Sequence, residues 1–469
     1  MMLFLRKNLL YLLLIYTFQV QAEVKLPALF ANGMVLQQNS KVKIWGFATG
    51  KKSVRITTSW NHQRHQVNIA ENGNWQTFVA TPAAGGPYHI SIEQENKIVL
   101  TDVLIGEVWI CSGQSNMDMP VKGYGGLPVK NSMEILLDAP NEKLRLFHVE
   151  KAFSMVPKKD VKGTWEHADA GSVSSFSAVG YQFASFLQKH LGIPVGIIQT
   201  TWGGSPIEAW TDRSVVENLL GERLAADRAI SKANHQTPGN LYNAMVKPLA
   251  GYNIAGVIWY QGEQNRHNHQ DYLALQQTMV KLWRKDWAIG SWPFYAVQLA
   301  PMMYGKEPVL AVPLLREAQL QLTDSLENTG IAIAIDAGEA HNIHPPDKTI
   351  IAKRLAYLAL DKTYHKKGIV SSGPRFQSML IRGDTLVVKF ANVSLGMTSY
   401  GKQITQFEIA GKDHTFYPAD AQIKDDKIIL VSKEVKHPVA VRYGFHDWCI
   451  GELYNVEGLP ASPFRTDSW

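Results

Sequence analysis

The pattern of apolar and polar positions divides the chain into three parts, of which the first is strand-like. Between residues 23 and 102, short runs alternate apolar and polar side chains, as at 41–46, 53–58 and 88–93, and turn sequences such as ENGN at 71–74 separate them. A period of two is typical of strands that bury one face. We therefore predict an N-terminal β domain, similar to a small sandwich, over residues 23–102.

The last hundred residues return to this pattern. The runs at 385–390, 427–431 and 439–443 alternate or are continuously apolar, and Gly, Asp and Pro residues separate them. They predict a second, C-terminal β domain over residues 369–469.

The part between them, residues 103–368, predicts an α/β domain. Short continuous apolar runs are typical of buried parallel strands, and amphipathic stretches such as 179–190 and 348–364 are typical of the helices that cover them. The expected strands lie at 108–111, 195–199, 256–260, 294–297 and 330–335.

The N-terminus has the features of an export signal over residues 1–22. Arg6 and Lys7 precede an apolar run from Leu9 to Val20, and the sequence VQA at 20–22 suits cleavage. The run is shorter than the roughly 20 residues of a spanning helix. We expect a cleaved signal and a periplasmic or secreted protein, with no stable membrane insertion; an uncleaved anchor is the alternative.

Composition and charge exclude several classes of function. The net charge is +6, only 19% of residues are charged, and cations are not clustered, so nucleic acid is not an expected partner. The two cysteines, Cys111 and Cys449, cannot form a disulfide framework and pair once at most. We interpret Cys111 as a packed thiol inside an apolar run.

Polar motifs follow the predicted strands of the middle part at the point where each strand ends. Because ligands of open α/β sheets bind at the carboxyl ends of the strands, we expect these motifs to meet in one site. The motifs are SGQSN at 112–116, TTWGGS at 200–205, QGEQN at 261–265 and DAGEAHNIHP at 336–345.

This set of motifs predicts acyl-transfer chemistry. Ser115 follows Gly113 at a strand-to-helix turn, which suits an exposed nucleophile, although an isolated serine there is usually a helix cap. His344 is the expected general base, with His341 as its competitor. The Ser115 N–H, the Gly204 N–H and the Gln261 side-chain amide are the expected oxyanion donors.

The alternatives for these donors are structural. A Gly-Gly pair also suits a tight turn, and Gln261 also suits a buried structural amide. Glu263 and Asn265 are expected to brace loops. Trp202 is expected to bind sugar, since aromatic faces suit sugar rings, although Trp residues also fill cores. No metal-binding or phosphate-loop motif is present, so no cofactor is expected.

Several blocks together resemble the sialate O-acetylesterases of the SGNH-hydrolase superfamily, and the resemblance covers nearly the whole chain after residue 22. The blocks are FANGMVLQQ at 30–38, GEVWICSGQSNM at 106–117, WGGS at 202–205 with Trp210, LYNAM at 241–245, GVIWYQGEQN at 256–265, IHP at 343–345 and GLPASPFR at 458–465.

The resemblance implies a flavodoxin-like three-layer α/β/α catalytic domain flanked by β domains. It also implies metal-free removal of acetyl groups from sialic acids or sialoglycans, with the 9-O-acetyl ester as first candidate. Carried over by position, Ser115 is the nucleophile, His344 the base, and Gly204 and Gln261 oxyanion donors.

One departure from the family concerns the acid of the triad. Asn342 and His341 stand where many relatives carry an acid, and an amide cannot stabilise an imidazolium as a carboxylate does. An amide or a backbone carbonyl can still orient His344, and Asp336 and Glu339 lie on the same predicted loop. The third member of the triad therefore stays open.

The substrate also stays open, because catalytic blocks do not determine which sugar is bound. Sialic acid carries a carboxylate, for which Arg316 is the expected partner; the alternative for Arg316 is a charge on a helix surface. Acetylated plant polysaccharide such as xylan is the rival substrate. The two β domains and the missing acid also fit a carbohydrate-binding protein that has lost catalysis.

Overall fold

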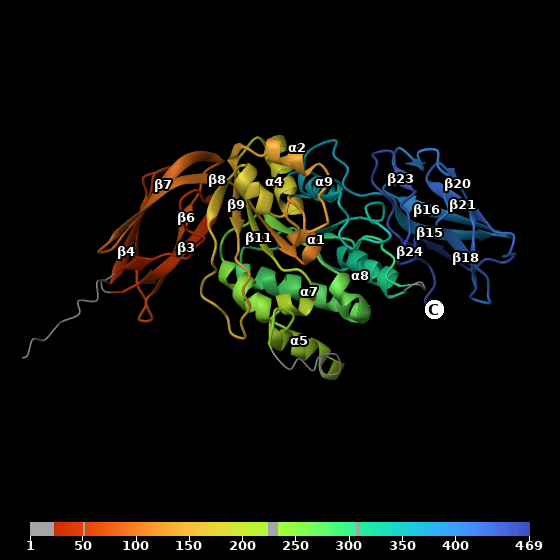
Figure 1. Cartoon of the computed structure of the whole chain (residues 1–469), viewed down its shortest axis with the longest axis horizontal. Helices are drawn as coiled ribbons and strands as arrows, with labels where there is room; N and C mark the ends of the chain where they lie inside the picture. The colour runs from red at the N-terminus through yellow and green to blue at the C-terminus, as the bar shows by residue number, and fades with distance from the viewer. Residues whose placement is uncertain (1–22, 50–51, 224–232, 306–309) are drawn as a thin grey trace, which may run out of the picture.

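The computed structural model describes residues 23–49, 52–223, 233–305 and 310–469 (Figure 1). The predicted export signal, residues 1–22, lies outside these ranges. Among the described residues, no helix combines the length and the apolar character needed to cross a membrane.

A mostly parallel sheet forms the centre of the molecule, and its strands follow the order β10-β9-β11-β8-β12-β13-β14. All neighbours are parallel except β10, which is antiparallel to β9 at one edge. The carboxyl ends of the parallel strands therefore meet along one side of the sheet. The strands are β8 (Lys97–Gly113), β9 (Asn141–His148), β10 (Trp165–Ala168), β11 (Val195–Thr201), β12 (Gly256–Tyr260), β13 (Phe294–Val297) and β14 (Thr329–Ala332).

Helices cover both faces of this sheet. Successive side chains of its strands point to opposite faces, so they pack into two different cores. Trp109 and Cys111 of β8 pack in one core, together with the two contacting helices α4 (Ala178–Leu191) and α9 (Lys348–Leu358). Both cysteines, Cys111 and Cys449, are buried and unpaired.

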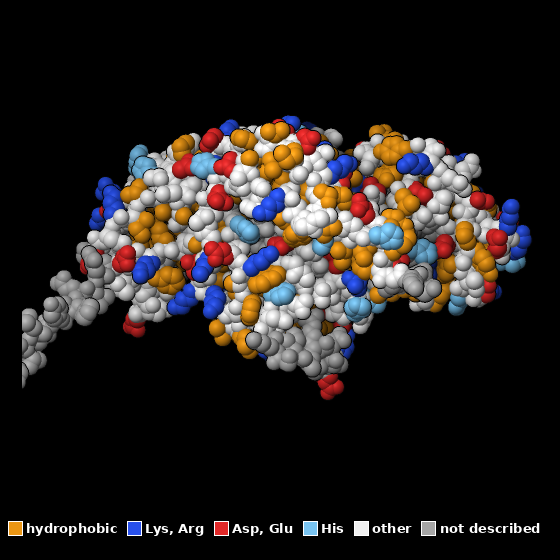
Figure 2. Space-filling view, in the orientation of Figure 1, with side chains coloured by type: hydrophobic (Ala, Val, Ile, Leu, Met, Phe, Trp, Pro, Cys, Tyr) orange, Lys and Arg blue, Asp and Glu red, His pale blue; other side chains and the backbone are white. Residues whose placement is uncertain are grey.

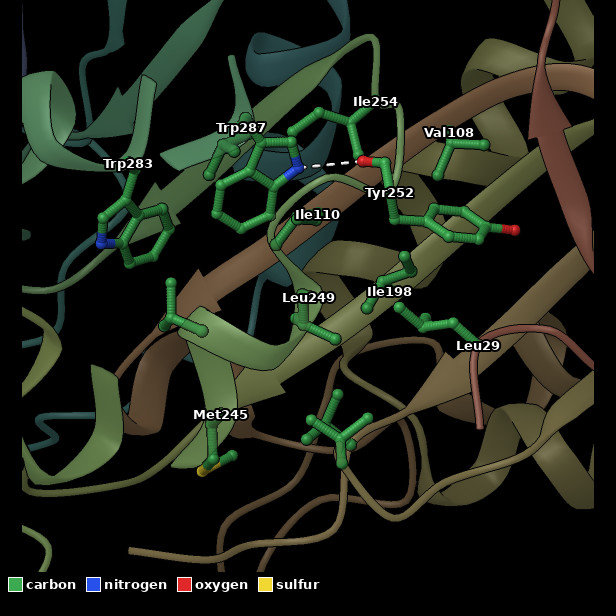
Figure 3. Packing of buried hydrophobic residues seen from close by; sticks show 14 of the residues in the cluster. Leu29, Val108, Ile110, Ile198, Met245, Leu249, Tyr252, Ile254, Trp283 and Trp287 are labelled. Atoms are coloured by element: carbon green, nitrogen blue, oxygen red, sulfur yellow. Dashed lines mark hydrogen bonds between the residues drawn. The ribbon is translucent and has the colours of Figure 1, made fainter. Parts of the chain in front are cut away.

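The second core lies on the other face of the sheet and contains Val108 and Ile110 of β8, under α7 (His269–Trp287) and α8 (Ala311–Ser325). Figure 3 shows this core, in which the Trp287 indole donates a hydrogen bond of 2.9 Å to the Tyr252 carbonyl. The shorter helices are α1 (Ser115–Asp118), α2 (Ser132–Leu137), α3 (Ala170–Ser175), α5 (Arg213–Leu220), η1 (Ile207–Trp210), η2 (Tyr242–Val246), η3 (Lys247–Leu249), η4 (Glu263–Asn268) and η5 (Ala359–Thr363).

The β-rich N-terminal part is joined to the central sheet by one continuous strand. The first half of β8 pairs antiparallel with β7, and its second half pairs with β11 and β12. Residue 102, the predicted end of the N-terminal domain, lies inside this strand. The other strands of this part are β1 (Val24–Lys25), β2 (Val35–Gln37), β3 (Lys41–Ala48), β4 (Ser53–Thr58), β5 (Arg64–Asn68), β6 (Asn74–Ala80) and β7 (Gly85–Glu93).

The C-terminal part is also β-rich and has its own core, into which Ile333 and Ile335 from the segment after β14 pack. It lies at the opposite end of the molecule from the N-terminal strands (Figure 1). Its strands are β15 (Arg375–Arg382), β16 (Thr385–Ala391), β17 (Met397–Thr398), β18 (Phe407–Ala410), β19 (Phe416–Pro418), β20 (Asp420–Lys424), β21 (Lys427–Val431), β22 (Ala440–Tyr443), β23 (Tyr454–Asn455) and β24 (Phe464–Arg465).

Candidate active site

The turn that follows β8 sets the position of Ser115. At Gly113, φ is +134° and an added Cβ would lie 2.2 Å from the Tyr260 carbonyl oxygen, so only glycine fits. The Gln114 N–H donates to that same carbonyl at 3.0 Å, and α1 begins at the next residue. Ser115 therefore lies at the carboxyl edge of the central strand.

The loop after β11 brings two glycines to this serine. A Cβ added at Gly203 would lie 3.4 Å from the Ser115 Cβ, and Gly204 has a φ of +69°. The Gly204 carbonyl accepts a hydrogen bond of 2.9 Å from the Gln236 amide. The Ser115 and Gly204 N–H groups donate to no other group in the described part of the chain. An oxyanion hole needs donors that are free in this way.

His344 lies beside this turn, although its imidazole and the Ser115 hydroxyl do not hydrogen-bond each other. Both ring nitrogens are shielded from solvent and have no partner among the described residues. The ring meets the Tyr124 ring edge to face, with 5.5 Å between centroids. Burial lowers the pKa of His344, and the charge of Lys348 lowers it further. The imidazole is therefore neutral near pH 7 and able to accept a proton.

The peptide group between Ile343 and His344 is held at both of its polar atoms. The Asn116 side-chain amide donates to the Ile343 carbonyl at 2.9 Å, and the His344 N–H donates to Asn342 Oδ1 at 2.9 Å. Asn342, which stands where relatives carry an acid, thus orients His344 through the backbone.

Neither carboxylate on the loop supports the imidazole directly. Both oxygens of Asp336 bind Arg354, at 2.6 and 2.7 Å, and Glu339 accepts from the Asn342 amide at 3.3 Å. His341 is exposed. The suggestion that Asp336 or Glu339 completes a triad is therefore wrong for this structure, because each is bound to another group.

A buried polar network joins three of the loops beneath the site. Asn116 accepts from Lys348 Nζ at 2.6 Å and donates to Glu263 Oε1 at 2.5 Å. Burial lowers the pKa of Lys348 to about 7 and raises that of Glu263. Glu263 thus braces the loops, as expected, whereas the sequence pattern had not indicated a role for Asn116 or Lys348. The adjacency of Asn116 to the nucleophile was the available signal.

Gln261 is not an oxyanion donor in this structure, which corrects that prediction. Its buried amide donates to Gln114 Oε1 at 3.1 Å, the Ser205 carbonyl at 3.2 Å and Asn265 Oδ1 at 2.7 Å. Its carbonyl oxygen accepts from the Tyr272 hydroxyl at 2.9 Å. Gln261 therefore has the structural role that the sequence analysis gave as its alternative, because every polar atom of its side chain is bound inside the protein.

Arg316 is a second correction, because it is fully buried and holds the protein together. Its guanidinium donates to three backbone carbonyls, those of Leu299 at 2.8 Å, His446 at 2.6 Å and Asp447 at 2.8 Å. The bonds to His446 and Asp447 join α8 to the C-terminal part. Arg316 is therefore neither the carboxylate ligand nor the helix-surface charge that the sequence suggested.

We expect Arg316→Met to lower the free energy of unfolding by about 3 kcal/mol, because it leaves buried carbonyls without donors. Urea denaturation followed by fluorescence measures this. The matched control is Arg382→Met, which removes an exposed arginine of β15. Equal stability of the two variants would contradict the structural role of Arg316.

Of the four aromatic residues near the motifs, only Trp202 borders the site. It is half-buried, and its indole stacks on the His235 ring with 4.9 Å between centroids and 6° between planes. Trp210, Trp259 and Tyr260 are buried in the two cores. Trp202 is therefore the one of these four that is not part of a core.

Comparisons with known proteins show which family the chain resembles. The family described as "Carbohydrate esterase, sialic acid-specific acetylesterase" matches residues 105–358. Sialate O-acetylesterase of Homo sapiens is 30% identical, covering 92% of this chain and 90% of its own, and that of Mus musculus is 29% identical, covering 92% of both chains.

A solved structure is similar over almost the whole chain. It is described as a novel carbohydrate acetylesterase from Xanthomonas citri, is 34% identical, has a TM-score of 0.87, and covers 95% of this chain and 100% of its own. The family match spans the Ser115 turn, both glycines and His344. The chain therefore belongs to the sialic acid-specific acetylesterase family of carbohydrate esterases.

Proposed function

We propose that this protein is a serine esterase that releases acetate from O-acetylated sugars, with O-acetylated sialic acids as its first candidate substrates. The observation that carries the proposal is the position of Ser115 on a glycine turn, next to Gly203 and beside His344, whose ring nitrogens are shielded from solvent. The names of the human and mouse relatives support the choice of sialic acid.

The proposed reaction has two steps. The Ser115 oxygen attacks the acetyl carbonyl while His344 takes the hydroxyl proton, and the N–H groups of Ser115 and Gly204 stabilise the oxyanion. His344 then protonates the leaving sugar oxygen, which leaves an acetyl group on Ser115. A water molecule, deprotonated by His344, hydrolyses this ester and releases acetate, and the proton returns to Ser115.

We propose that Ser115 and His344 act as a dyad without a directly bound acid. The two hydrogen bonds to the Ile343–His344 peptide group supply the orientation that an acid provides elsewhere. Glu263 and Lys348, both bonded to Asn116, hold in place the residue that donates to this peptide group.

The proposed fold class is the flavodoxin-like three-layer domain of the SGNH hydrolases, over residues 103–368, with β domains at 23–102 and 369–469. The helix layers on both faces of the parallel sheet support it. We place the protein in the periplasm or outside the cell, on the basis of the N-terminal sequence.

One observation favours a second substrate, acetylated plant polysaccharide such as xylan. The carboxylate of sialic acid needs a cation, and Arg316, the residue expected to supply it, is bound entirely inside the protein. A neutral sugar has no such requirement. Deacetylation of a neutral polysaccharide is therefore the rival function.

Acetate release from 9-O-acetylated sialic acid and from acetylated xylan distinguishes these functions. We expect purified protein to release acetate at least tenfold faster, in kcat/KM, from the sialic acid ester. Faster release from xylan would support the same mechanism but would make acetylated xylan, rather than sialic acid, the substrate. Binding of either sugar without release would instead indicate a carbohydrate-binding protein.

A further inference from the structure

We propose that Phe153, Trp202 and His235 form a binding site for the sugar ring next to the acetylated one, so that the enzyme prefers oligosaccharides to free monosaccharides. This inference rests on the proposed function and specifies its substrate. We call these three residues the aromatic strip.

The aromatic strip begins at the nucleophile. Trp202 immediately precedes Gly203, at which an added Cβ would lie 3.4 Å from the Ser115 Cβ. The Trp202 N–H donates to the Gly113 carbonyl at 3.1 Å. A ring bound against Trp202 is therefore close to the ester under attack.

Two further aromatic rings contact Trp202. His235 covers one side of the indole by stacking, and Phe153 packs at 6.4 Å between ring centroids, tilted by 56°. Phe153 is 47% exposed. Aromatic faces of this kind suit the apolar C–H faces of pyranose rings, which is why a sugar is the occupant that we propose.

The segment that carries Phe153 is fixed in place before any ligand binds. Lys151 Nζ donates to Asp118 in α1 at 2.8 Å. The Ser154 N–H donates to the Asn240 carbonyl at 3.0 Å, and the Ser154 carbonyl accepts from the Asn243 amide at 3.2 Å. A surface ordered in advance loses less conformational entropy on binding.

The same segment exposes two further apolar side chains. Met155 and Val156 are each 63% exposed, next to Phe153. This segment joins β9 to β10, and Figure 2 shows hydrophobic side chains interleaved with cationic and histidine side chains on the corresponding part of the surface (compare Figure 1). Apolar faces with a polar rim are typical of sugar-binding surfaces, because sugars offer both kinds of group.

The first test compares Phe153→Ala with wild type on an O-acetylated xylo-oligosaccharide or sialyl-trisaccharide and on the matching acetylated monosaccharide. We expect the ratio of the two kcat/KM values, oligosaccharide over monosaccharide, to fall about tenfold. The control is Leu395→Ala, which truncates a residue that is 75% exposed in the C-terminal part and should keep the wild-type ratio. An unchanged ratio in Phe153→Ala overturns the inference.

The second test does not depend on turnover. Deacetylated oligosaccharide is titrated into Ser115→Ala with and without Phe153→Ala, and binding is followed by tryptophan fluorescence. We expect the Kd to rise about tenfold in the double variant. If the two Kd values are equal, the aromatic strip is overturned, even where the wild-type protein releases acetate. If Phe153→Ala weakens binding but the wild-type protein releases no acetate, the aromatic strip is supported and the proposed esterase function is overturned.

Discussion

Ser115→Ala is expected to lower kcat for acetate release by about a thousandfold or more, whichever sugar is the substrate. The variant removes the atom that attacks the ester, while the N–H of residue 115 and that of Gly204 remain. It therefore keeps substrate binding and oxyanion stabilisation, so KM should change much less than kcat. Initial rates of acetate release over a range of substrate concentrations measure both constants.

The control for this result is Ser175→Ala, which removes an exposed serine hydroxyl at the end of α3. Its kcat should match that of wild type, and both variants should unfold at the wild-type urea concentration. If Ser115→Ala kept a tenth of the wild-type kcat, Ser115 would not be the nucleophile.

His344→Gln is expected to lower kcat by a similar factor, because the variant removes the imidazole that we propose takes the Ser115 proton. His341 is exposed on the same loop, and Lys348 is bound to Asn116. The control is His341→Gln, which should keep most of the wild-type activity. The reverse result would assign the base to His341.

The pH profile of the wild-type enzyme provides a second measurement on His344. Only the neutral imidazole accepts a proton, so kcat/KM is lost as pH falls through the pKa of His344. Burial and the charge of Lys348 lower this pKa from its ordinary value of 6.5. We therefore expect the acid limb of the profile to lie below pH 6.5, and a midpoint above that value would contradict the buried, acid-free environment.

The central strands could be predicted because parallel strands covered on both faces consist of apolar residues. Four of the five predicted runs lie within strands β8, β11, β12 and β13, whereas only the first half of the fifth, 330–332, lies in β14. β9 and β10, toward the edge of the sheet, were missed: β9 begins with Asn-Glu-Lys, and only its second half is buried. The predicted helix at 348–364 divides into α9 and the π-helical turn η5, a change of period that local propensity does not indicate.

Within the active site, the sequence by itself determined the placement of Ser115, Gly204 and His344, because parallel topology brings the ends of neighbouring strands together. Only the tertiary structure decided the roles of Gln261 and Arg316. The role of a buried polar side chain depends on which partners reach it, and Gln114 and Asp447, the partners of Gln261 and Arg316, lie 147 and 131 residues away along the chain. Such partners follow from the packing of the whole chain rather than from any local pattern.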